Sequence, residues 1–425
     1  MSLLRRWFDP IRSRLFYQTP SRQEELPIEK GLTIYLRLDD VYSYLIAQQL
    51  PKLNEILTDE LKPLKIVISD TSDEPPNNMT TQEWQHYCLK DAKILAKQHR
   101  FGYDDQPELP SPQSLQQATT ILKNTPLRED AFLYLLEDVF HMLWQQQYGK
   151  IKTLYAMSQA RPQPQEFSER LFTHQPVGES YFEFGEKKYH AVDDLLRLMR
   201  RLKQQKLLTD NPIFLPNHIE WREHAINDAE DLADIHALHP ELDLYIALED
   251  PISWLLLAYI QEELVGYYNI DLNVYPLSYH GRDEFDWALA TRLSKRTQVA
   301  FTPFCRPNEQ AVQNIAQLFY SAAPEERIQT VYDILKAVWT QGRDLSYAPH
   351  VKALQTQLGI SLDTELSIPS ILEHNDAQCV SKHQPNFPVL ELRVDGATYT
   401  FNSLYRVWMI ESIFNNVLDR KYKQH

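Results

Sequence analysis

An internal repeat is the feature that most constrains the fold of this 425-residue chain. The segment IYLRLDDVYSYL at residues 34–45 returns as LYIALEDPISWL at residues 244–255. Both copies have the pattern of a short apolar strand, then an acidic pair, then an apolar helix. The identical aligned positions are Tyr35/Tyr245, Leu38/Leu248, Asp40/Asp250, Ser43/Ser253 and Leu45/Leu255. The repeat therefore predicts two copies of one structural unit instead of a single large core.

The segments after each copy of the repeat agree in kind and in order. A second strand is expected at residues 64–69 and again at 270–277, and a long block with helical periodicity follows each of them. Each half then closes with a hairpin and a helix, and the second hairpin turns at Asp395-Gly396, a strong turn signal. This order is β-α-β, a helical block, then β-β-α. It predicts an α/β fold of two tandem thioredoxin-like domains, each with an inserted helical subdomain.

These patterns divide the chain into four predicted segments. They are an N-terminal arm at residues 1–30, a first domain at 31–208, a connector with one helix at 209–240, and a second domain at 241–425. Within the arm, residues 3–16 place large apolar side chains at helical spacing, with arginines between them. Such a basic amphipathic helix is typical of a contact with a membrane surface or a partner protein. A helix that docks its apolar stripe on its own domain has the same pattern.

Composition and charge argue against several classes of function. The formal net charge of −15 is the opposite of the basic surface that nucleic-acid binding requires, so no nucleic-acid partner is expected. No run of 18 apolar residues occurs, which predicts no transmembrane segment, and the N-terminus lacks a signal-peptide pattern. His236 and His239 have no third ligand at recognisable spacing, so no metal site is predicted. Cys88, Cys305 and Cys379 form no C-x-x-C pair, which predicts a reducing, cytoplasmic location without dithiol redox activity.

The helix after each acidic pair resembles the first helix of a known family. Residues 40–45 (DVYSYL) and 250–255 (DPISWL) are similar to the Ser-Pro-[Tyr/Phe]-Ser-[Tyr/Trp]-Leu segment of 2-hydroxychromene-2-carboxylate isomerases. These enzymes share a family with DsbA-like oxidoreductases and kappa-class glutathione transferases. Residues 89–97 (LKDAKILAK) look like the helix that leads into this family's inserted domain. Phe387-Pro388, before a predicted strand, resembles its cis-proline site, so the resemblance extends over both halves of the chain.

This resemblance implies a small organic or glutathione-like ligand beside the N-terminus of the first helix. It also implies that the chain is related to isomerases, glutathione transferases and oxidoreductases. In the family, the first serine of the motif stabilises the glutathione thiolate, and here Asp40 and Asp250 occupy that place. Glutathione is therefore a candidate cofactor, but these two residues disfavour its binding, because a carboxylate repels a thiolate. Because kappa-type proteins commonly work as dimers, the two domains are expected to pack as an internal pseudo-dimer.

The predicted site residues follow from the same alignment. The candidate catalytic residues are Asp40, Ser43, Asp250 and Ser253, and the candidate ligand-binding residues are Tyr42, Asp193, Phe387 and Pro388. The first copy is the preferred ligand site for two reasons. It retains Asp193, which matches the aspartate that holds the glutathione amine in the family, and it has an aromatic Tyr42-Ser43-Tyr44 lining.

Simpler interpretations of these residues are also available. Asp40 and Asp250 have the position of helix N-caps, whose carboxylates accept backbone N–H groups and contribute about 1 kcal/mol. The adjacent Asp39 and Glu249 complete a carboxylate pair in each copy, and crowding can raise the pKa of one member. Neighbours at a strand end, however, point in opposite directions. The chain is accordingly either a ligand-binding member of this enzyme family or a non-catalytic scaffold whose sites decayed after duplication.

Overall fold

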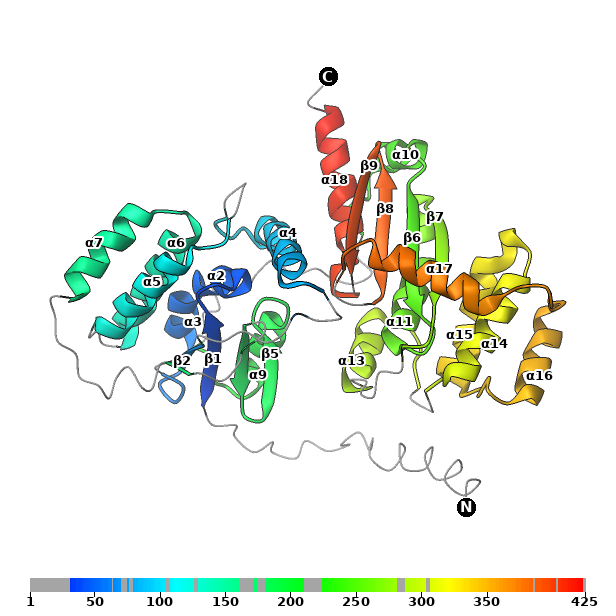
Figure 1. Cartoon of the computed structure of the whole chain (residues 1–425), viewed down its shortest axis with the longest axis horizontal. Helices are drawn as coiled ribbons and strands as arrows, with labels where there is room; N and C mark the ends of the chain where they lie inside the picture. Colours follow the sequence, from blue (N-terminus) through cyan, green and yellow to red (C-terminus); the bar gives the residue numbers. More distant parts are fainter. Residues whose placement is uncertain are drawn as a thin grey trace, which may run out of the picture. The chain divides into compact units, whose positions relative to one another are not determined.

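A computed structural model describes most of the chain. The described residues are 31–62, 64–69, 75, 79–103, 108–125, 129–159, 172–173, 177, 180–209, 224–280, 287–302, 306–384, 387–402 and 404–422. They form two compact units (Figure 1), which we call the first unit (within Gln23–His218) and the second unit (within Ile219–His425). The amphipathic arm predicted at residues 1–30 lies outside the described residues.

A five-stranded sheet with the order β3-β2-β1-β4-β5 forms the centre of the first unit. The elements of this unit, in chain order, are β1 (Leu32–Arg37), α2 (Val41–Ala47), α3 (Leu50–Ile56), β2 (Lys65–Ser69), α4 (Thr81–His99), α5 (Pro112–Asn124), α6 (Glu129–Trp144), α7 (Tyr148–Gln159), β3 (Phe172–Thr173), β4 (Tyr181–Phe184), β5 (Lys187–His190) and α9 (Leu195–Gln204). Strand β1 runs parallel to β2 and antiparallel to β4, and β4 forms an antiparallel hairpin with β5.

A four-stranded sheet with the order β7-β6-β8-β9 forms the centre of the second unit. The elements of this unit are α10 (Ala229–Ala237), β6 (Glu241–Ala247), α11 (Pro251–Tyr259), the π-helix η1 (Ile260–Val265), α12 (Gly266–Tyr268), β7 (Asp271–Leu277), α13 (Trp287–Thr297), α14 (Glu309–Ser321), the 3₁₀ turn η2 (Pro324–Glu326), α15 (Arg327–Gln341), α16 (Ala348–Leu358), α17 (Ile368–Val380), β8 (Val389–Val394), β9 (Ala397–Asn402), the 3₁₀ turn η3 (Leu404–Arg406) and α18 (Met409–Tyr422). Strand β6 runs parallel to β7 and antiparallel to β8, and β8 pairs with β9 as a hairpin.

The two sheets share one arrangement of strands. In each, the first strand lies between a parallel partner and an antiparallel hairpin, and helices separate that partner from the hairpin along the chain. The two-residue strand β3 is an addition of the first unit. This mixed α/β arrangement is consistent with thioredoxin-like folds, so the predicted α/β class is confirmed. The predicted order of strands, helical block and hairpin is present in each unit.

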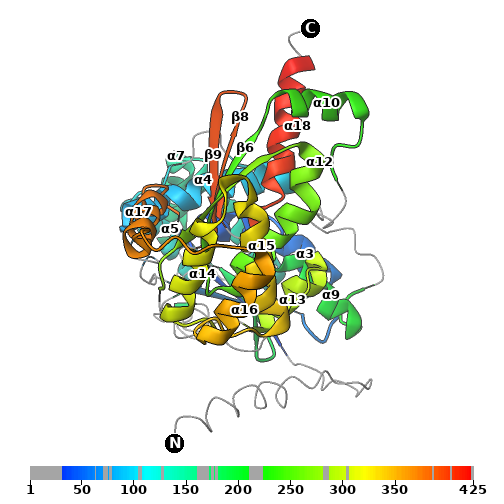
Figure 2. The same cartoon turned by 90° about the vertical axis from the view of Figure 1, so that its right-hand side faces the viewer.

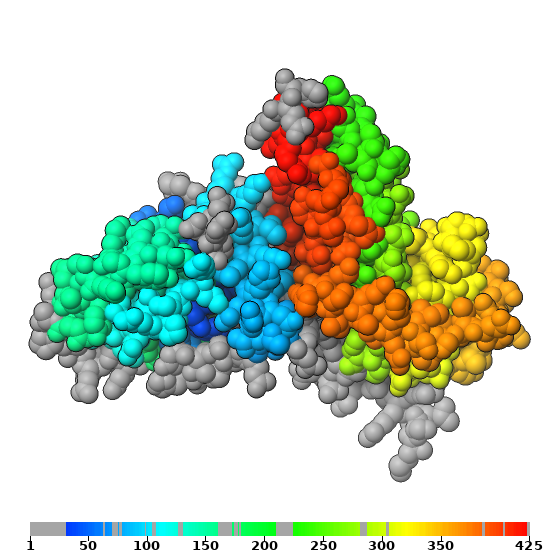
Figure 3. Space-filling view, turned by 45° about the horizontal axis from the view of Figure 1, so that its top comes forward, coloured from blue at the N-terminus to red at the C-terminus, as the bar shows by residue number. Residues whose placement is uncertain are grey.

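Apolar alternation explains how the strands bury their side chains. In β1, Leu32, Ile34 and Leu36 are at most 2% exposed, while the residues between them are half-buried. Strand β6 is buried along nearly its whole length, as expected for a central strand with helices on both faces. Figures 1 and 2 show α17 and α18 on opposite faces of the second-unit sheet. In the space-filling view, α17 lies beside β8 and β9 at the surface of this unit (Figure 3).

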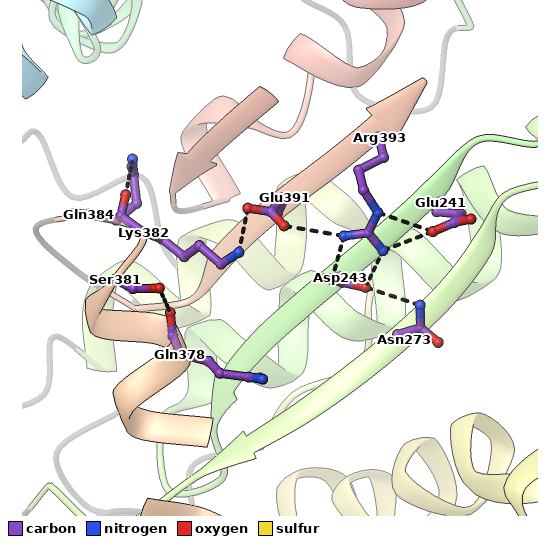
Figure 4. A network of polar contacts seen from close by, with 9 residues as sticks. All are labelled: Glu241, Asp243, Asn273, Gln378, Ser381, Lys382, Gln384, Glu391 and Arg393. Atoms are coloured by element: carbon purple, nitrogen blue, oxygen red, sulfur yellow. Dashed lines mark hydrogen bonds and ion pairs between the residues drawn. The ribbon is translucent and has the colours of Figure 1, made fainter. Parts of the chain in front are cut away.

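A charged network holds the hairpin of the second unit against β6 (Figure 4). The guanidinium of Arg393, on β8, donates to Asp243 at 2.6 and 3.0 Å and to Glu241 at 2.9 and 3.0 Å, both on β6. It also donates to Glu391 at 3.2 Å, and Lys382 donates to the other oxygen of that carboxylate at 2.6 Å. Each of these carboxylates therefore has a cationic partner across or beside the sheet.

The predicted connector helix is shorter than expected and packs on the second unit. The helix was expected around residues 221–237, but among the described residues it begins at Ala229. Asp228 sets this start, because its carboxylate accepts the N–H groups of Glu230 and Asp231 and so caps the helix. Helix α10 then contacts α18. No helix within the described parts of the chain is long and apolar enough to cross a membrane.

Candidate functional site

Asp40 caps helix α2 of the first unit. Its carboxylate accepts the N–H of Tyr42 at 3.3 Å and that of Ser43 at 2.8 Å, and the Ser43 hydroxyl donates to it at 2.7 Å. The Ser43 oxygen in turn accepts the N–H of Arg37 at 2.9 Å, and Ser43 is fully buried. The N-cap interpretation thus accounts for the geometry of both predicted residues.

Asp250 makes the same cap on helix α11 of the second unit. It accepts the N–H groups of Ile252 at 3.1 Å and Ser253 at 3.3 Å, and the Ser253 hydroxyl donates to it at 3.1 Å. Ser253, like Ser43, is fully buried. The repeat therefore reproduces a complete capping motif, in which each serine hydroxyl is turned toward its own aspartate.

The other predicted residues of the first unit do not form one group. The Tyr42 hydroxyl donates to Asp91 on α4 at 2.8 Å in a buried contact. Asp193 is exposed, two residues before α9 begins. Whether either residue touches a ligand stays a prediction.

Phe387 and Pro388 lie at the other predicted site, directly before β8, and the peptide bond between them is cis. The Phe387 ring stacks on the imidazole of His280, with ring centroids 4.6 Å apart. His280 follows β7, so the carboxyl ends of β6 and β7 and the start of β8 meet at one edge of the sheet.

Glu249, at this same edge, is a buried carboxylate with one oxygen that lacks a hydrogen-bond partner in the described part of the chain. It is 1% exposed, and its Oε1 accepts the backbone N–H of His280 at 2.9 Å. Its Oε2 is buried and has no hydrogen-bond partner among the described residues. Burial is the main cause that raises the pKa of Glu249, and the nearby charge of Asp250 adds to it. Backbone hydrogen bonds from His280 and from Glu249 itself, together with the charge of His280, act in the opposite direction.

Asp376, on α17, completes the surroundings of His280. Its Oδ1 lies 3.7 Å from the imidazole Nε2. The same carboxylate accepts the backbone N–H of Ser278 at 3.1 Å and also its hydroxyl. The side chains of His280 and Asp376 are 27% and 24% exposed, so solvent reaches both. We call the residues Glu249, Ser278, His280, Asp376 and Phe387 the Glu249 cluster.

The sequence analysis identified only part of this cluster. Glu249 was noted as the neighbour of Asp250, and Phe387 as part of the cis-proline segment. His280 was missed, although β6 and β7 are parallel and their carboxyl ends share one edge, which would have brought it near Glu249. Asp376 comes from a helix about 100 residues farther along the chain, and no local pattern indicates its position.

The cysteines of the described residues are buried and form no disulfide. Cys88 lies on α4 and Cys379 on α17, and burial raises the pKa of the Cys379 thiol to about 12. Such a thiol carries little thiolate at neutral pH and is a poor nucleophile. Cys305 lies outside the described residues. Within the parts of the chain that are described, no group of three or more histidine, cysteine or carboxylate side chains could hold a metal ion.

Comparison with known proteins gives similarities at the level of solved structures. No family model and no curated protein matches the chain. A candidate protein disulfide isomerase from Nitrosomonas europaea is 16% identical at a TM-score of 0.34, over 44% of this chain and 98% of that one. The cytosolic disulfide reductase DsbM from Pseudomonas aeruginosa is 13% identical at a TM-score of 0.33, over 44% of this chain and 100% of that one. A 2-hydroxychromene-2-carboxylate isomerase is 15% identical at a TM-score of 0.33, over 44% of this chain and 99% of that one. These structures belong to the DsbA-like and isomerase group that the motifs resemble.

Proposed function

We propose that this chain is a thioredoxin-fold protein that binds a small organic ligand at the Glu249 cluster of the second unit, without dithiol chemistry. One observation carries the proposal. Glu249 is buried, yet its Oε2 has no hydrogen-bond partner of good geometry among the described residues. An unsatisfied buried polar atom costs about 1–3 kcal/mol, so its retention calls for a compensating role. A ligand that supplies the missing hydrogen bond is such a role.

The surroundings of Glu249 suit a ligand with both polar and apolar parts. The stacked rings of His280 and Phe387 offer an apolar face, while Asp376 and the imidazole offer polar groups. Ligand sites in proteins commonly combine a largely apolar lining with a few polar groups. Relatives of this fold include a 2-hydroxychromene-2-carboxylate isomerase, so an isomerase acting on a small organic molecule belongs to the same proposal.

Glutathione is the ligand that the family resemblance suggests and that the caps oppose. Asp40 and Asp250 already fill the anion-accepting N-termini of α2 and α11 with their own carboxylates. We therefore expect weak or negligible glutathione binding by the native chain. Asp40→Ser should improve it if the first unit descends from a glutathione site, with Asp193→Ala as the control that removes the amine contact.

A scaffold role is the second candidate, and one observation favours it for the first unit. There the hydroxyls of Ser43 and Tyr42 both donate to internal carboxylates. The first unit would then support the second instead of binding a ligand. The tandem duplication, the packing of the two domains as a pseudo-dimer and a cytoplasmic location stay part of this proposal.

A binding screen tests the proposed function. The full chain is titrated calorimetrically, and its thermal stability is measured, with glutathione, its S-conjugates and a set of small aromatic amines, alcohols and acids. A ligand of the folded protein must raise the melting temperature by mass action. Binding that is lost on His280→Ala but kept on Asp193→Ala supports the site in the second unit. No stabilisation by any compound at millimolar concentration would favour the scaffold role for the whole chain.

A further inference from the structure

Two carboxylates of the Glu249 cluster contact His280, one through its backbone and the other beside its ring. Glu249 accepts from the backbone of His280, and Asp376 lies beside its ring. No lysine or arginine pairs with either carboxylate among the described residues. The cluster therefore carries more acidic than basic side chains, and one of its carboxylates, Glu249, is closed to water.

Elsewhere in the chain, carboxylates at comparable positions have cationic partners. On the same sheet, buried Asp243 and Glu391 pair with Arg393 and Lys382 (Figure 4). In the first unit, Asp39 occupies the repeat position of Glu249 and pairs with Arg37 at 2.9 Å. The residue aligned with Arg37 in the second copy is Ala247, which has no charge to offer. Glu249 thus has no counterpart of the Arg37 cation that pairs with Asp39.

We infer that Glu249 makes this site selective for a small organic cation, an aryl-substituted primary ammonium ion, whose N–H groups bind Oε2. The inference rests on the proposed function and names the class of its ligand. The ring pair of His280 and Phe387 would contact the aryl group, and aromatic faces also attract ammonium ions. Because Oε2 is buried, side chains around it must move for the ammonium group to reach it.

Binding of a cation should displace a proton. Burial favours the protonated form of Glu249 when the site is empty, and the charged groups that face it are His280 and Asp250, with Asp376 behind His280. An arriving ammonium ion supplies the positive charge that the proton otherwise provides. The carboxyl proton then leaves to the solvent, and the net charge of the site is conserved.

Three matched compounds test this inference on the full chain. They are 2-phenylethylamine, 2-phenylethanol and 3-phenylpropionate, which present a cationic, a neutral and an anionic group on similar frames. Titration calorimetry at mildly acidic pH, in two buffers of different ionisation enthalpy, measures affinity and proton release together. We expect the amine to bind at least about tenfold more tightly than the alcohol, with up to one proton released for each ligand bound.

Variants locate the effect. Glu249→Gln keeps the shape of the side chain and should abolish both the preference for the amine and the proton release. Asp376→Asn should weaken the preference by a smaller factor. Asp39→Asn, at the equivalent position of the first unit, should leave both readouts unchanged. Circular dichroism of each variant establishes that it is folded.

The outcomes separate this inference from the function on which it rests. Equal binding of amine and alcohol, or a preference that persists in Glu249→Gln, would overturn the inference and leave a ligand site in place. Tight binding of the anionic compound alone would do the same. Absence of binding by all three compounds and by the glutathione series would overturn both.

Discussion

The two units differ most at the carboxylate that precedes each helix cap. The repeat places a carboxylate there in both units, Asp39 in the first and Glu249 in the second. In the first unit, the Asp39 side chain is 45% exposed and accepts the Arg37 guanidinium at 2.9 Å. In the second unit, Glu249 is 1% exposed, and one of its oxygens has no partner among the described residues. One repeat position thus holds a surface ion pair in one unit and a buried, half-satisfied carboxyl in the other.

This difference teaches which properties the repeat preserves. Backbone course and capping are preserved, because Asp40 and Asp250 accept equivalent N–H groups and equivalent serine hydroxyls. The environment of the preceding carboxylate is not preserved, since it depends on side chains outside the matching positions. Arg37 has no counterpart at Ala247, and the backbone N–H of His280, beyond β7, donates to Glu249.

Removal of Arg393 should have the largest effect on stability. It tests how much the second unit depends on the cation that pairs with Asp243 and Glu391. Arg393→Met leaves Asp243 and Glu391 without their main cation on the sheet. Breaking a buried pair costs about 3–5 kcal/mol, but the Arg393 side chain is 34% exposed. We therefore expect a loss of about 2–3 kcal/mol in the free energy of unfolding of the second unit, measured by urea denaturation.

A surface pair of the same unit provides the control for Arg393. Arg420→Met removes a cation 3.8 Å from Asp395, where both side chains are about half exposed. Such pairs contribute roughly 0–1 kcal/mol, so the change in stability should be small. Equal losses for the two arginine variants would show that the network of Figure 4 adds nothing beyond a surface ion pair.

The two caps should respond alike, with the first unit more sensitive. Asp40→Ala should cost about 1–2 kcal/mol, because Asp40 is buried and accepts its closest two hydrogen bonds at 2.7 and 2.8 Å. Asp250→Ala should cost about 1 kcal/mol, since its three bonds are 3.1–3.3 Å long. Asp→Asn at either position should cost only a few tenths of the loss expected for the alanine variant at that position. A large loss of stability on Asp40→Asn would reveal a role for the charge that capping does not explain.

Glu249 should make the stability of the second unit depend on pH in a direction opposite to that of most carboxylates. Its folded-state pKa is raised, so the folded protein binds more protons than the unfolded chain above the ordinary glutamate value. The free energy of unfolding should therefore fall as the pH rises from that ordinary value to the raised one. Glu249→Gln should remove this fall and, at neutral pH, raise the stability by about 1 kcal/mol.

Asp39→Asn is the matched comparison for Glu249→Gln. Asp39 is exposed and paired, so this change should alter the free energy of unfolding by roughly 0.5 kcal/mol or less, with no gain at higher pH. Urea titrations of both variants between mildly acidic and neutral pH provide the measurement. If the free energy of unfolding of Glu249→Gln still falls as the pH rises, a group other than Glu249 causes the pH dependence.

The fold was predictable because local patterns and long-range order agree. The repeat, the parallel strand pairs and the Asp395-Gly396 turn all indicate the sheet arrangement that is observed. The start of α10 was not predicted, because it is set by the cap at Asp228, whose carboxylate accepts two backbone N–H groups. Helix ends are set by single capping contacts, which periodicity does not contain.

The site was less predictable than the fold, for a physical reason. The caps follow from two residues in sequence, Asp40 and Asp250, and the structure has both. The surroundings of Glu249 depend on His280, which donates to its Oε1, and the surroundings of His280 depend on Asp376 of α17. Burial and the absence of a partner are properties of packing, so no spacing along the chain expresses them.

The smallest effect is expected where the two units do not differ, in dithiol chemistry. The chain has no C-x-x-C pair in either half, and burial raises the pKa of Cys379 to about 12. Reduction of a disulfide by this route requires an accessible thiolate and a second thiol to resolve the mixed disulfide. The purified protein should therefore give no turnover in an insulin-reduction assay, and replacement of Cys88, Cys305 and Cys379 by serine or alanine should change nothing. Activity that disappears with a single cysteine would point to a one-thiol mechanism and would identify the unit that provides it. Activity that survives all three replacements would mean that the chain reduces disulfides without any thiol of its own, contrary to the proposed function.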